Sequence, residues 1–113
     1  MKPMGSSQDG IYEVMKNGNF YTIWDIRKLI ALRYNIHVME TTISAKMRSF
    51  RWLENRVKYK LSTDLREEVL IKEKRVNGGG YLYKLIIPEI KDNVVDFNYE
   101  YTINELKKLG YPV

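Results

Sequence analysis

The feature that most constrains the fold of this chain is a change in residue pattern near Val69. Before this point apolar residues recur mostly at helical spacing, whereas "VLIKEKRV" and "YLYKLIIP" are two β-favouring runs on either side of "NGGG". A glycine-rich connection between two such runs predicts a β-hairpin. Pro88 marks its end, because proline has no N–H to donate across the ladder. Helices followed by a hairpin predict an α+β fold.

The first two helices are predicted from their end signals. One begins after Ser6 or Ser7 and runs to about Asn17, with Gly18 just past its end, although Gly10 also allows a later start. The other begins at Thr22, which can form a capping box with Asp25, and ends near Asn35, a residue type that tolerates left-handed backbone. The residues expected to face inward are Ile11, Val14 and Met15 in the first helix, and Ile23, Ile26, Leu29, Ile30 and the Arg33/Tyr34 position in the second.

A third helix follows the short connection "IHVMET". We expect Thr41 or Thr42 to cap it, because a threonine hydroxyl can accept from the free N–H groups of a first turn. Its inward residues are expected to be Ile43, Met47 and Phe50. Residues 53–68 fit a longer helix, a brief strand or a turn, and the pattern does not choose between these alternatives.

The C-terminal part predicts one more short helix. Thr102 and Glu105 fit a capping box, and Gly110 and Pro112 follow as helix-stop residues. A length of 113 residues suits one compact domain with appendages. The expected divisions are an N-terminal arm, a central domain and a C-terminal extension, at residues 1–8, 9–88 and 89–113.

The formal net charge of +5 is concentrated in one segment. Between Thr41 and Lys60 the only acid is Glu54, and the excess of positive charge in this segment equals that of the whole chain. Its basic residues are Lys46, Arg48, Arg51, Arg56, Lys58 and Lys60. Residues 88–113 are mildly acidic. Such asymmetry is typical of a polyanion-binding surface, although a basic solvated surface gives the same pattern.

Catalytic and metal-binding chemistry find little support. The chain has no cysteine and a single histidine, His37, so neither a thiolate site nor a pair of histidine ligands can form. "NGGG" is not followed by Gly-Lys-Ser/Thr, and Glu67 and Glu68 are adjacent carboxylates that point to different faces. We therefore predict no enzymatic activity, no metal and no cofactor.

The N-terminal stretch "MKPMGSSQDG" lacks the apolar core of a signal peptide. The apolar runs of the sequence are far shorter than the ~20 residues that a membrane-spanning helix needs. We therefore expect a soluble, cytoplasmic protein that does not associate with a membrane.

Two stretches, "YTIWDIRKLIALRYNIHVMETTISAKMRSFRW" and "VLIKEKRVNGGGYLYKLI", together resemble the winged helix-turn-helix family of DNA-binding domains. The first matches the helix-turn-helix, the second matches the β-hairpin wing, and the likeness covers roughly residues 9–87. The chain is also similar to small phage and prophage helix-turn-helix proteins, whose second helix carries a Ser-Ala-Arg/Lys run like "ISAKMR". The resemblance implies a three-helix core plus a wing, and sequence-selective binding of double-stranded DNA by a phage or bacterial regulator of transcription or replication.

The same resemblance makes the helix after Thr41 the recognition helix. Its outward side chains are short and polar or basic, which suits close approach to base edges and phosphates. The expected base-contacting residues are Thr42, Ser44, Ala45, Lys46, Arg48 and Ser49. The expected phosphate contacts are Arg51, Arg56 and Lys58, with Lys74 and Arg75 in the wing. We expect Trp24 and Trp52 in the core or at its edge, and not as base-stacking platforms.

A second function fits the same scaffold. The segment "VVDFNYEYTINELKKLGYPV" is slightly acidic and rich in tyrosine and apolar residues. It could dock on its own domain, pair with a second copy or bind a partner protein. The alternative is therefore a protein-interaction module without DNA binding, for example a phage adaptor, while a homodimer would favour a palindromic DNA site.

Overall fold

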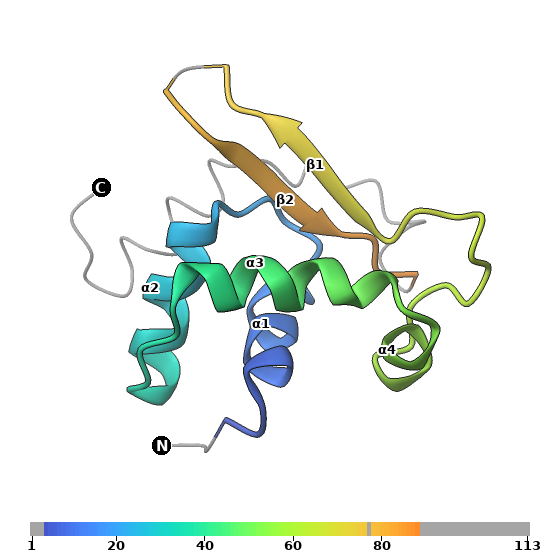
Figure 1. Cartoon of the computed structure of the whole chain (residues 1–113), viewed down its shortest axis with the longest axis horizontal. Helices are drawn as coiled ribbons and strands as arrows, with labels where there is room; N and C mark the ends of the chain where they lie inside the picture. The colour runs from blue at the N-terminus through green and yellow to red at the C-terminus, as the bar shows by residue number, and fades with distance from the viewer. Residues whose placement is uncertain (1–3, 77, 89–113) are drawn as a thin grey trace.

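Figure 1 shows the computed structural model of the chain, which describes residues 4–76 and 78–88. These residues form four α-helices, one turn of 3-10 helix and an antiparallel β-hairpin, so the predicted α+β class is confirmed. The elements in chain order are α1 (Ser7–Met15), α2 (Ile23–Tyr34), α3 (Glu40–Arg48), η1 (Ser49–Arg51), α4 (Leu53–Lys58), β1 (Leu70–Lys74) and β2 (Tyr81–Leu85).

Reciprocal capping boxes begin α1 and α2. In α1 the Ser6 hydroxyl accepts from the N–H of Asp9, whose carboxylate accepts from the N–H of Ser6. Thr22 and Asp25 make the same pair of hydrogen bonds at the start of α2. Asn35 closes α2 in the left-handed conformation, with φ of 55°. The predicted starts of both helices and the predicted end of α2 are confirmed.

α3 begins earlier than predicted. Its N-cap is Met39, which offers no side-chain hydrogen bond, and Glu40 is its first residue. The carbonyl of Met39 already accepts from the N–H of Ile43 at 3.0 Å, so Thr41 and Thr42 lie inside the first turn. The prediction that one of these threonines caps the helix is wrong. A negative charge at Glu40 is instead what the positive end of the helix dipole favours.

The core is built from the apolar stripes of the helices and the first residues of the hairpin. α1 packs against both α2 and α3, and in Figure 1 it lies behind α3. The inward residues predicted for α1 and for η1 with α3 are all buried, whereas in α2 Ile23 and Tyr34 are only partly buried. The core includes Ile11, Val14, Met15, Ile26, Leu29, Ile30, Ile43, Met47, Phe50, Leu70 and Leu85.

The predicted hairpin is confirmed. β1 pairs with β2 from Leu70 opposite Leu85 to Lys74 opposite Tyr81, and β2 ends before Pro88. An isolated bridge adds a third segment, because Tyr21 and Tyr83 exchange two backbone hydrogen bonds of 2.8 Å. This bridge, which sequence patterns did not predict, attaches the start of α2 to the hairpin.

The region left open by the sequence forms η1, α4 and a loop. Trp52 is extended, with ψ of 139°, and this separates η1 from α4. After α4, Lys60 is left-handed and the chain continues without regular structure to β1. Tyr59 anchors this region by stacking on Tyr12 with ring centroids 4.7 Å apart. The expected three-helix core therefore has a fourth helix between it and the wing.

The helix predicted near Thr102 and Glu105, like the rest of the C-terminal extension, lies outside the described residues. None of the helices in residues 4–76 and 78–88 is long and apolar enough to cross a membrane.

Candidate nucleic-acid interface

The outward face of α3 carries most of the predicted base-contacting residues. Ala45, Lys46 and Arg48 are exposed, and Thr42 and Ser44 are half-buried. With 100° between successive residues, Ser44 and Arg48 lie on one flank of the helix, and Thr42 and Lys46 lie on the other. The centre of this face therefore carries the small side chain of Ala45, and each flank carries one cation, Lys46 or Arg48.

Ser49 does not belong to that face. It is only 5% exposed, and its hydroxyl bonds to the Gln8 side chain and to the carbonyl of Lys46, each at 2.7 Å. Asn55 donates to the carbonyl of Ser49 at 2.6 Å. The expectation that Ser49 is a surface residue available to bases is wrong, because the chain tightens into η1 there and turns the hydroxyl toward α1.

The hairpin presents a continuous side toward the helices. Side chains of a strand alternate between faces, so the side that buries Leu70 and Leu85 continues with Lys72 and Tyr83 and then with Lys74 and Tyr81. Glu73 alternates to the opposite side. The helix-facing side of the hairpin is therefore apolar at its base and basic and aromatic toward its tip.

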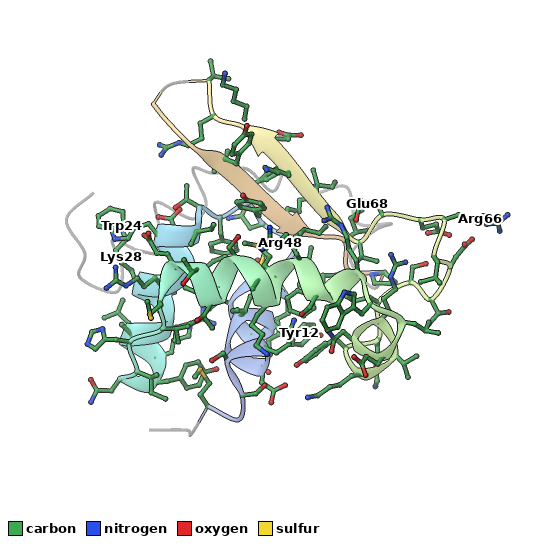
Figure 2. The ribbon with its side chains drawn as sticks, viewed as in Figure 1. Tyr12, Trp24, Lys28, Arg48, Arg66 and Glu68 are labelled. Atoms are coloured by element: carbon green, nitrogen blue, oxygen red, sulfur yellow. The ribbon has the colours of Figure 1, made fainter. Side chains whose placement is uncertain are left out.

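Between α3 and the hairpin is a small groove, which we call the α3–hairpin groove. It has a volume of about 100 Å³ and is lined by Ser44, Arg48, Arg51, Lys72 and Tyr83. Figure 2 shows Arg48 between α3 and the hairpin. Within residues 4–76 and 78–88 the Arg48 guanidinium makes no hydrogen bond or ion pair, so the structure leaves its five donors unsatisfied by protein.

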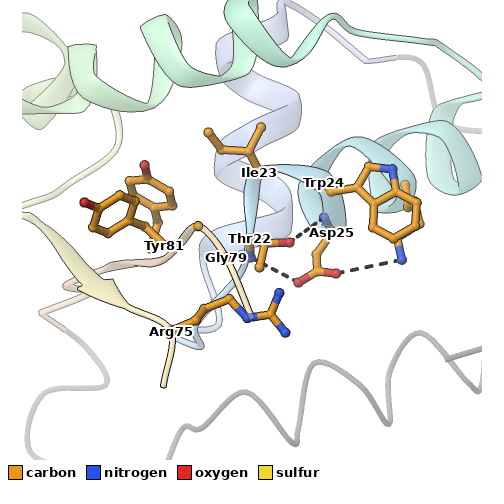
Figure 3. Close-up of a pocket in the computed structure, with 10 residues that line it drawn as sticks. Thr22, Ile23, Trp24, Asp25, Arg75, Gly79 and Tyr81 are labelled. Carbon is orange, nitrogen blue, oxygen red and sulfur yellow. Dashed lines mark hydrogen bonds and ion pairs between the residues drawn. The ribbon is translucent and has the colours of Figure 1, made fainter. Parts of the chain in front are cut away.

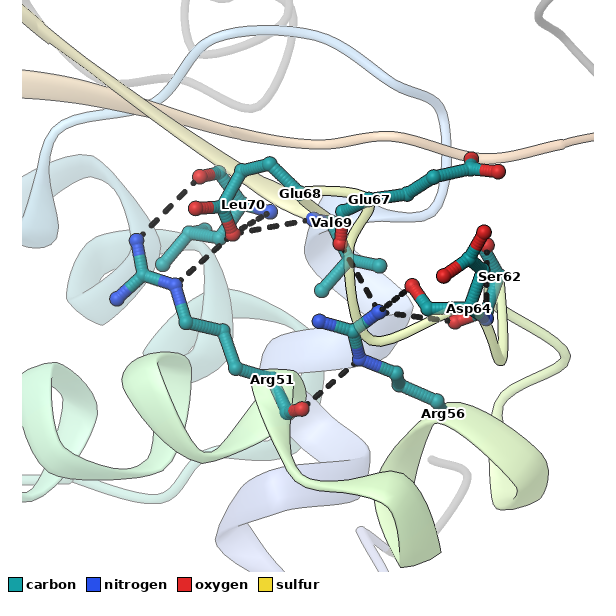
Figure 4. A network of polar contacts seen from close by, with 8 residues as sticks. All are labelled: Arg51, Arg56, Ser62, Asp64, Glu67, Glu68, Val69 and Leu70. Carbon is teal, nitrogen blue, oxygen red and sulfur yellow. Dashed lines mark hydrogen bonds and ion pairs between the residues drawn. The ribbon is translucent and has the colours of Figure 1, made fainter.

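Arg51 lines the same groove but is already paired. Its Nε lies 2.9 Å from a carboxylate oxygen of Glu68, and one Nη donates to the carbonyl of Leu70 at 3.5 Å (Figure 4). Burial acts to raise the pKa of Glu68, but the hydrogen bonds from Arg51 and from the N–H groups of Leu70 and Val69 outweigh it and lower this pKa. Glu68 therefore stays ionised and neutralises Arg51.

Arg56 is buried and donates hydrogen bonds to backbone carbonyls. It is 3% exposed, its Nε donates to the carbonyl of Arg51 at 2.8 Å, and Nη1 donates to three carbonyls of the following loop (Figure 4). These three acceptors belong to Ser62, Asp64 and Glu67, at 3.3, 2.8 and 3.0 Å. The expectation that Arg56 contacts a phosphate is wrong, because a buried guanidinium that holds the loop together cannot reach a surface ligand.

Lys58 is exposed but lies in another part of the surface. Its Nζ is 3.2 Å from the carboxylate of Asp9, in the first turn of α1. That turn is at the end of α1 remote from the hairpin in Figure 1. The Tyr59 hydroxyl also donates to Asp9, and this bond, partly opposed by burial, lowers the pKa of Asp9 to about 2. The structure does not bring Lys58 together with the α3–hairpin groove.

A second and larger cavity adjoins the groove, and we call it the tip pocket. It has a volume of about 420 Å³ and lies between the start of α2 and the end of the hairpin (Figure 3). Tyr83 lines both spaces. The residues lining the pocket are Thr22, Ile23, Trp24, Asp25, Lys28, Arg75, Gly79, Gly80, Tyr81 and Tyr83. Of the predicted wing contacts, Arg75 lines this pocket and Lys74 is exposed beside it.

The expectation that both tryptophans lie in the core or at its edge is wrong. Trp24 is 57% exposed and Trp52 is 60% exposed, so neither is a core residue. The sequence did contain a signal for the tyrosines that line the pocket, since alternation in "YLYKL" puts Tyr81, Tyr83 and Leu85 on one side of the strand. For Trp24 the only signal was its position outside the apolar stripe of α2.

In residues 4–76 and 78–88 no group of three or more histidine or acidic side chains could hold a metal ion, and His37 is exposed in the connection after α2. The residues lining the groove and the pocket offer cations, small hydroxyl side chains and aromatic rings. Comparisons with protein-family models, with curated proteins and with solved structures find no match to this chain.

Proposed function

We propose that this chain binds double-stranded DNA as a winged helix-turn-helix protein, with α3 as the recognition helix and the hairpin as the wing. The observation that carries the proposal is the α3–hairpin groove. There Arg48 of α3 and Lys72 of β1 line one space with Ser44. Two cations are brought together here from distant parts of the sequence, and none of the described residues lining the groove is a carboxylate, which favours an anionic ligand.

The arrangement of the elements supports the duplex as that ligand. A phosphate backbone offers negative charge along a line, and basic side chains follow the helix-facing side of the hairpin from Lys72 to Lys74. α3 is short and its exposed centre is Ala45, so its backbone can come close to base edges. The order of helices and hairpin is compatible with a winged helix.

The structure narrows the residues to which we assign contacts. For base edges they are Thr42, Ser44, Ala45, Lys46 and Arg48, and for phosphates they are Lys72, Lys74 and Arg75. Arg51 has a smaller part because Glu68 neutralises it. The phage or bacterial origin implied by the resemblance stays a prediction.

The test is a salt series of binding to duplex DNA. With about three or four phosphates neutralised, the slope of log affinity against log salt concentration should be about −3 to −4. Lys74→Ala should make the slope shallower by about one unit. Lys58→Ala is the matched control, since this lysine pairs with Asp9 on another part of the surface, and its slope should equal that of the parent. Absence of binding at low salt would refute the proposal.

A second candidate function is a protein-interaction module. Trp52, Leu53 and Val57 of the α4 region are all about half-exposed or more, and Leu53 and Val57 are one helical turn apart. Exposed apolar side chains on one short helix are typical of a protein contact. Lack of DNA binding, combined with loss of a partner or of self-association in Val57→Asp, would favour this function.

A further inference from the structure

The tip pocket has two aromatic walls, each accompanied by a cation. On one wall the Lys28 ammonium lies 3.7 Å from the centroid of the Trp24 ring. On the other, the Lys72 ammonium lies 4.1 Å from the centroid of the Tyr81 ring. Figure 3 shows Trp24 and Tyr81 on opposite sides of the pocket, with Ile23 and Thr22 between them. Cation–π contacts of this kind fix the rings in place before any ligand arrives.

The two walls belong to different elements, but the backbone holds them together. The two hydrogen bonds between Tyr21 and Tyr83 join the start of α2 directly to β2. The capping box of Thr22 and Asp25 then fixes the first turn of α2, which carries Trp24. These main-chain bonds therefore fix the relative position of the two backbone segments that carry Trp24 and Tyr81.

Glycines form one edge of the pocket. A β-carbon added at Gly79 or Gly80 would meet no atom of the described residues within 4 Å. A chain that enters over these glycines would have its ring between the aromatic walls while its backbone remained outside. The same chain would pass Tyr83 into the α3–hairpin groove, because Tyr83 lines both spaces.

The lining defines the chemistry of the ligand. Aromatic faces bind flat rings by stacking, whatever the ring's hydrogen-bonding pattern, and the cations beside them favour negative charge close to that ring. The buried acid of the pocket, Asp25, is 2% exposed, and its carboxylate lies 3.9 Å from the Lys28 ammonium. These two charges largely offset each other, so Lys72 beside the Tyr81 ring is the cation that favours an anion here. A nucleotide combines a flat ring with a phosphate, whereas an aromatic side chain of a peptide carries no such charge.

We propose that the tip pocket binds one unpaired nucleobase of a DNA strand whose duplex part lies in the α3–hairpin groove. This inference rests on the proposed duplex binding and specifies its substrate as a junction between double-stranded and single-stranded DNA. A base inside a duplex is covered by its neighbours and cannot enter the pocket, so the unpaired strand supplies the ring.

The experiment compares a blunt duplex with the same duplex carrying a short single-stranded overhang at either end. The overhang duplex should bind about tenfold more tightly, the range expected for stacking of one base. Trp24→Ala should reduce this ratio to near one, and Tyr81→Ala should do the same from the other wall. Trp52→Ala is the matched control, because it removes an equally exposed tryptophan from a different element and should leave the ratio at about ten.

Fluorescence provides a direct readout, since the chain has two tryptophans. In Trp52→Phe the remaining Trp24 should be quenched when the overhang duplex binds, and the blunt duplex should quench it much less. In Trp24→Phe the remaining Trp52 should respond equally to both duplexes.

The outcomes separate this inference from the proposed function. Binding of the blunt duplex with an overhang ratio near one in the parent would overturn the nucleobase pocket and leave duplex binding intact. Absence of binding to both duplexes would overturn both. If Trp24→Ala melts like the parent and still binds the overhang duplex about ten times more tightly than the blunt duplex, the unpaired strand binds elsewhere. That result would also overturn the assignment of this pocket. Retention of an aromatic peptide in place of the overhang strand, abolished by Trp24→Ala, would do so as well.

Discussion

Arg48 and Arg56 belong to the same basic stretch of the sequence, but their guanidinium groups meet opposite environments. Arg48 is exposed beside the hairpin and has no polar partner in residues 4–76 and 78–88. Arg56 is buried and donates to four carbonyls. One arginine is available to a ligand, and the other shapes the loop after α4. Positive charge in a sequence therefore indicates a binding surface only where the fold leaves the charge without an internal partner.

The same contrast extends to the neighbours of the two arginines. Around the α3–hairpin groove, Lys72 lies over the face of the Tyr81 ring, and within the described residues its ammonium makes no hydrogen bond or ion pair. Around α4, Lys58 and the Tyr59 hydroxyl both bond to Asp9. Within residues 4–76 and 78–88, cations beside the groove thus lack an acidic partner where those around α4 have one, and three variants test the proposal that only the first group binds a ligand.

The largest effect is expected from Arg56→Ala. It removes a buried guanidinium and leaves four partly buried backbone carbonyls without this donor, so the free energy of unfolding should fall by about 3 kcal/mol. Urea denaturation followed by circular dichroism measures this loss. Lys58→Ala, an exposed neighbour on the same helix, should change it by less than about 1 kcal/mol. Equal losses in the two variants would contradict the structural role of Arg56.

A smaller effect, on binding and not on stability, is expected from Arg48→Ala. Loss of its donors to base edges should cost about 1–3 kcal/mol on the preferred DNA site and much less on random DNA. Arg51→Ala is the matched variant, because Glu68 neutralises this arginine. Its loss of affinity should be smaller and nearly equal on both DNAs. The measurement is the affinity of each variant for the preferred site and for random DNA. If Arg48→Ala leaves the ratio of these two affinities unchanged, α3 does not contact base edges through this arginine.

The smallest effect concerns acid stability around α4. Because the hydrogen bond from Tyr59 lowers the pKa of folded Asp9 to about 2 from an ordinary 3.8, its contribution is present above about pH 4. It should be lost as the pH falls from about 4 to about 2, amounting to about 1 kcal/mol after allowance for partial exposure. Unfolding curves of the parent and of Asp9→Asn should therefore converge over this window. Parallel curves would show that Asp9 does not contribute in this way.

The tip pocket shows where the prediction of the site from sequence stopped. Trp24 was expected in the core or at its edge but is 57% exposed, since it lies outside the apolar stripe of α2. The residues that face it across the pocket belong to the hairpin, which is far away in sequence. Ser49 was expected on the surface but is buried, because its hydrogen-bond partner Gln8 lies 41 residues earlier in the sequence. Thr42, Ser44, Ala45, Lys46 and Arg48 were correctly expected on the accessible side of α3, fully or in part.

The sequence by itself determined the starts of α1 and α2, the end of α2 and the position of the hairpin. Each depends on bonds or steric limits within a few residues, such as the capping box of Thr22 and Asp25 or the left-handed Asn35. Only the tertiary structure decided which cations remain free and which aromatic rings are exposed. The reason is physical: the burial of a side chain and the pairing of a charge depend on the segments that pack beside it, and a local pattern does not contain those segments.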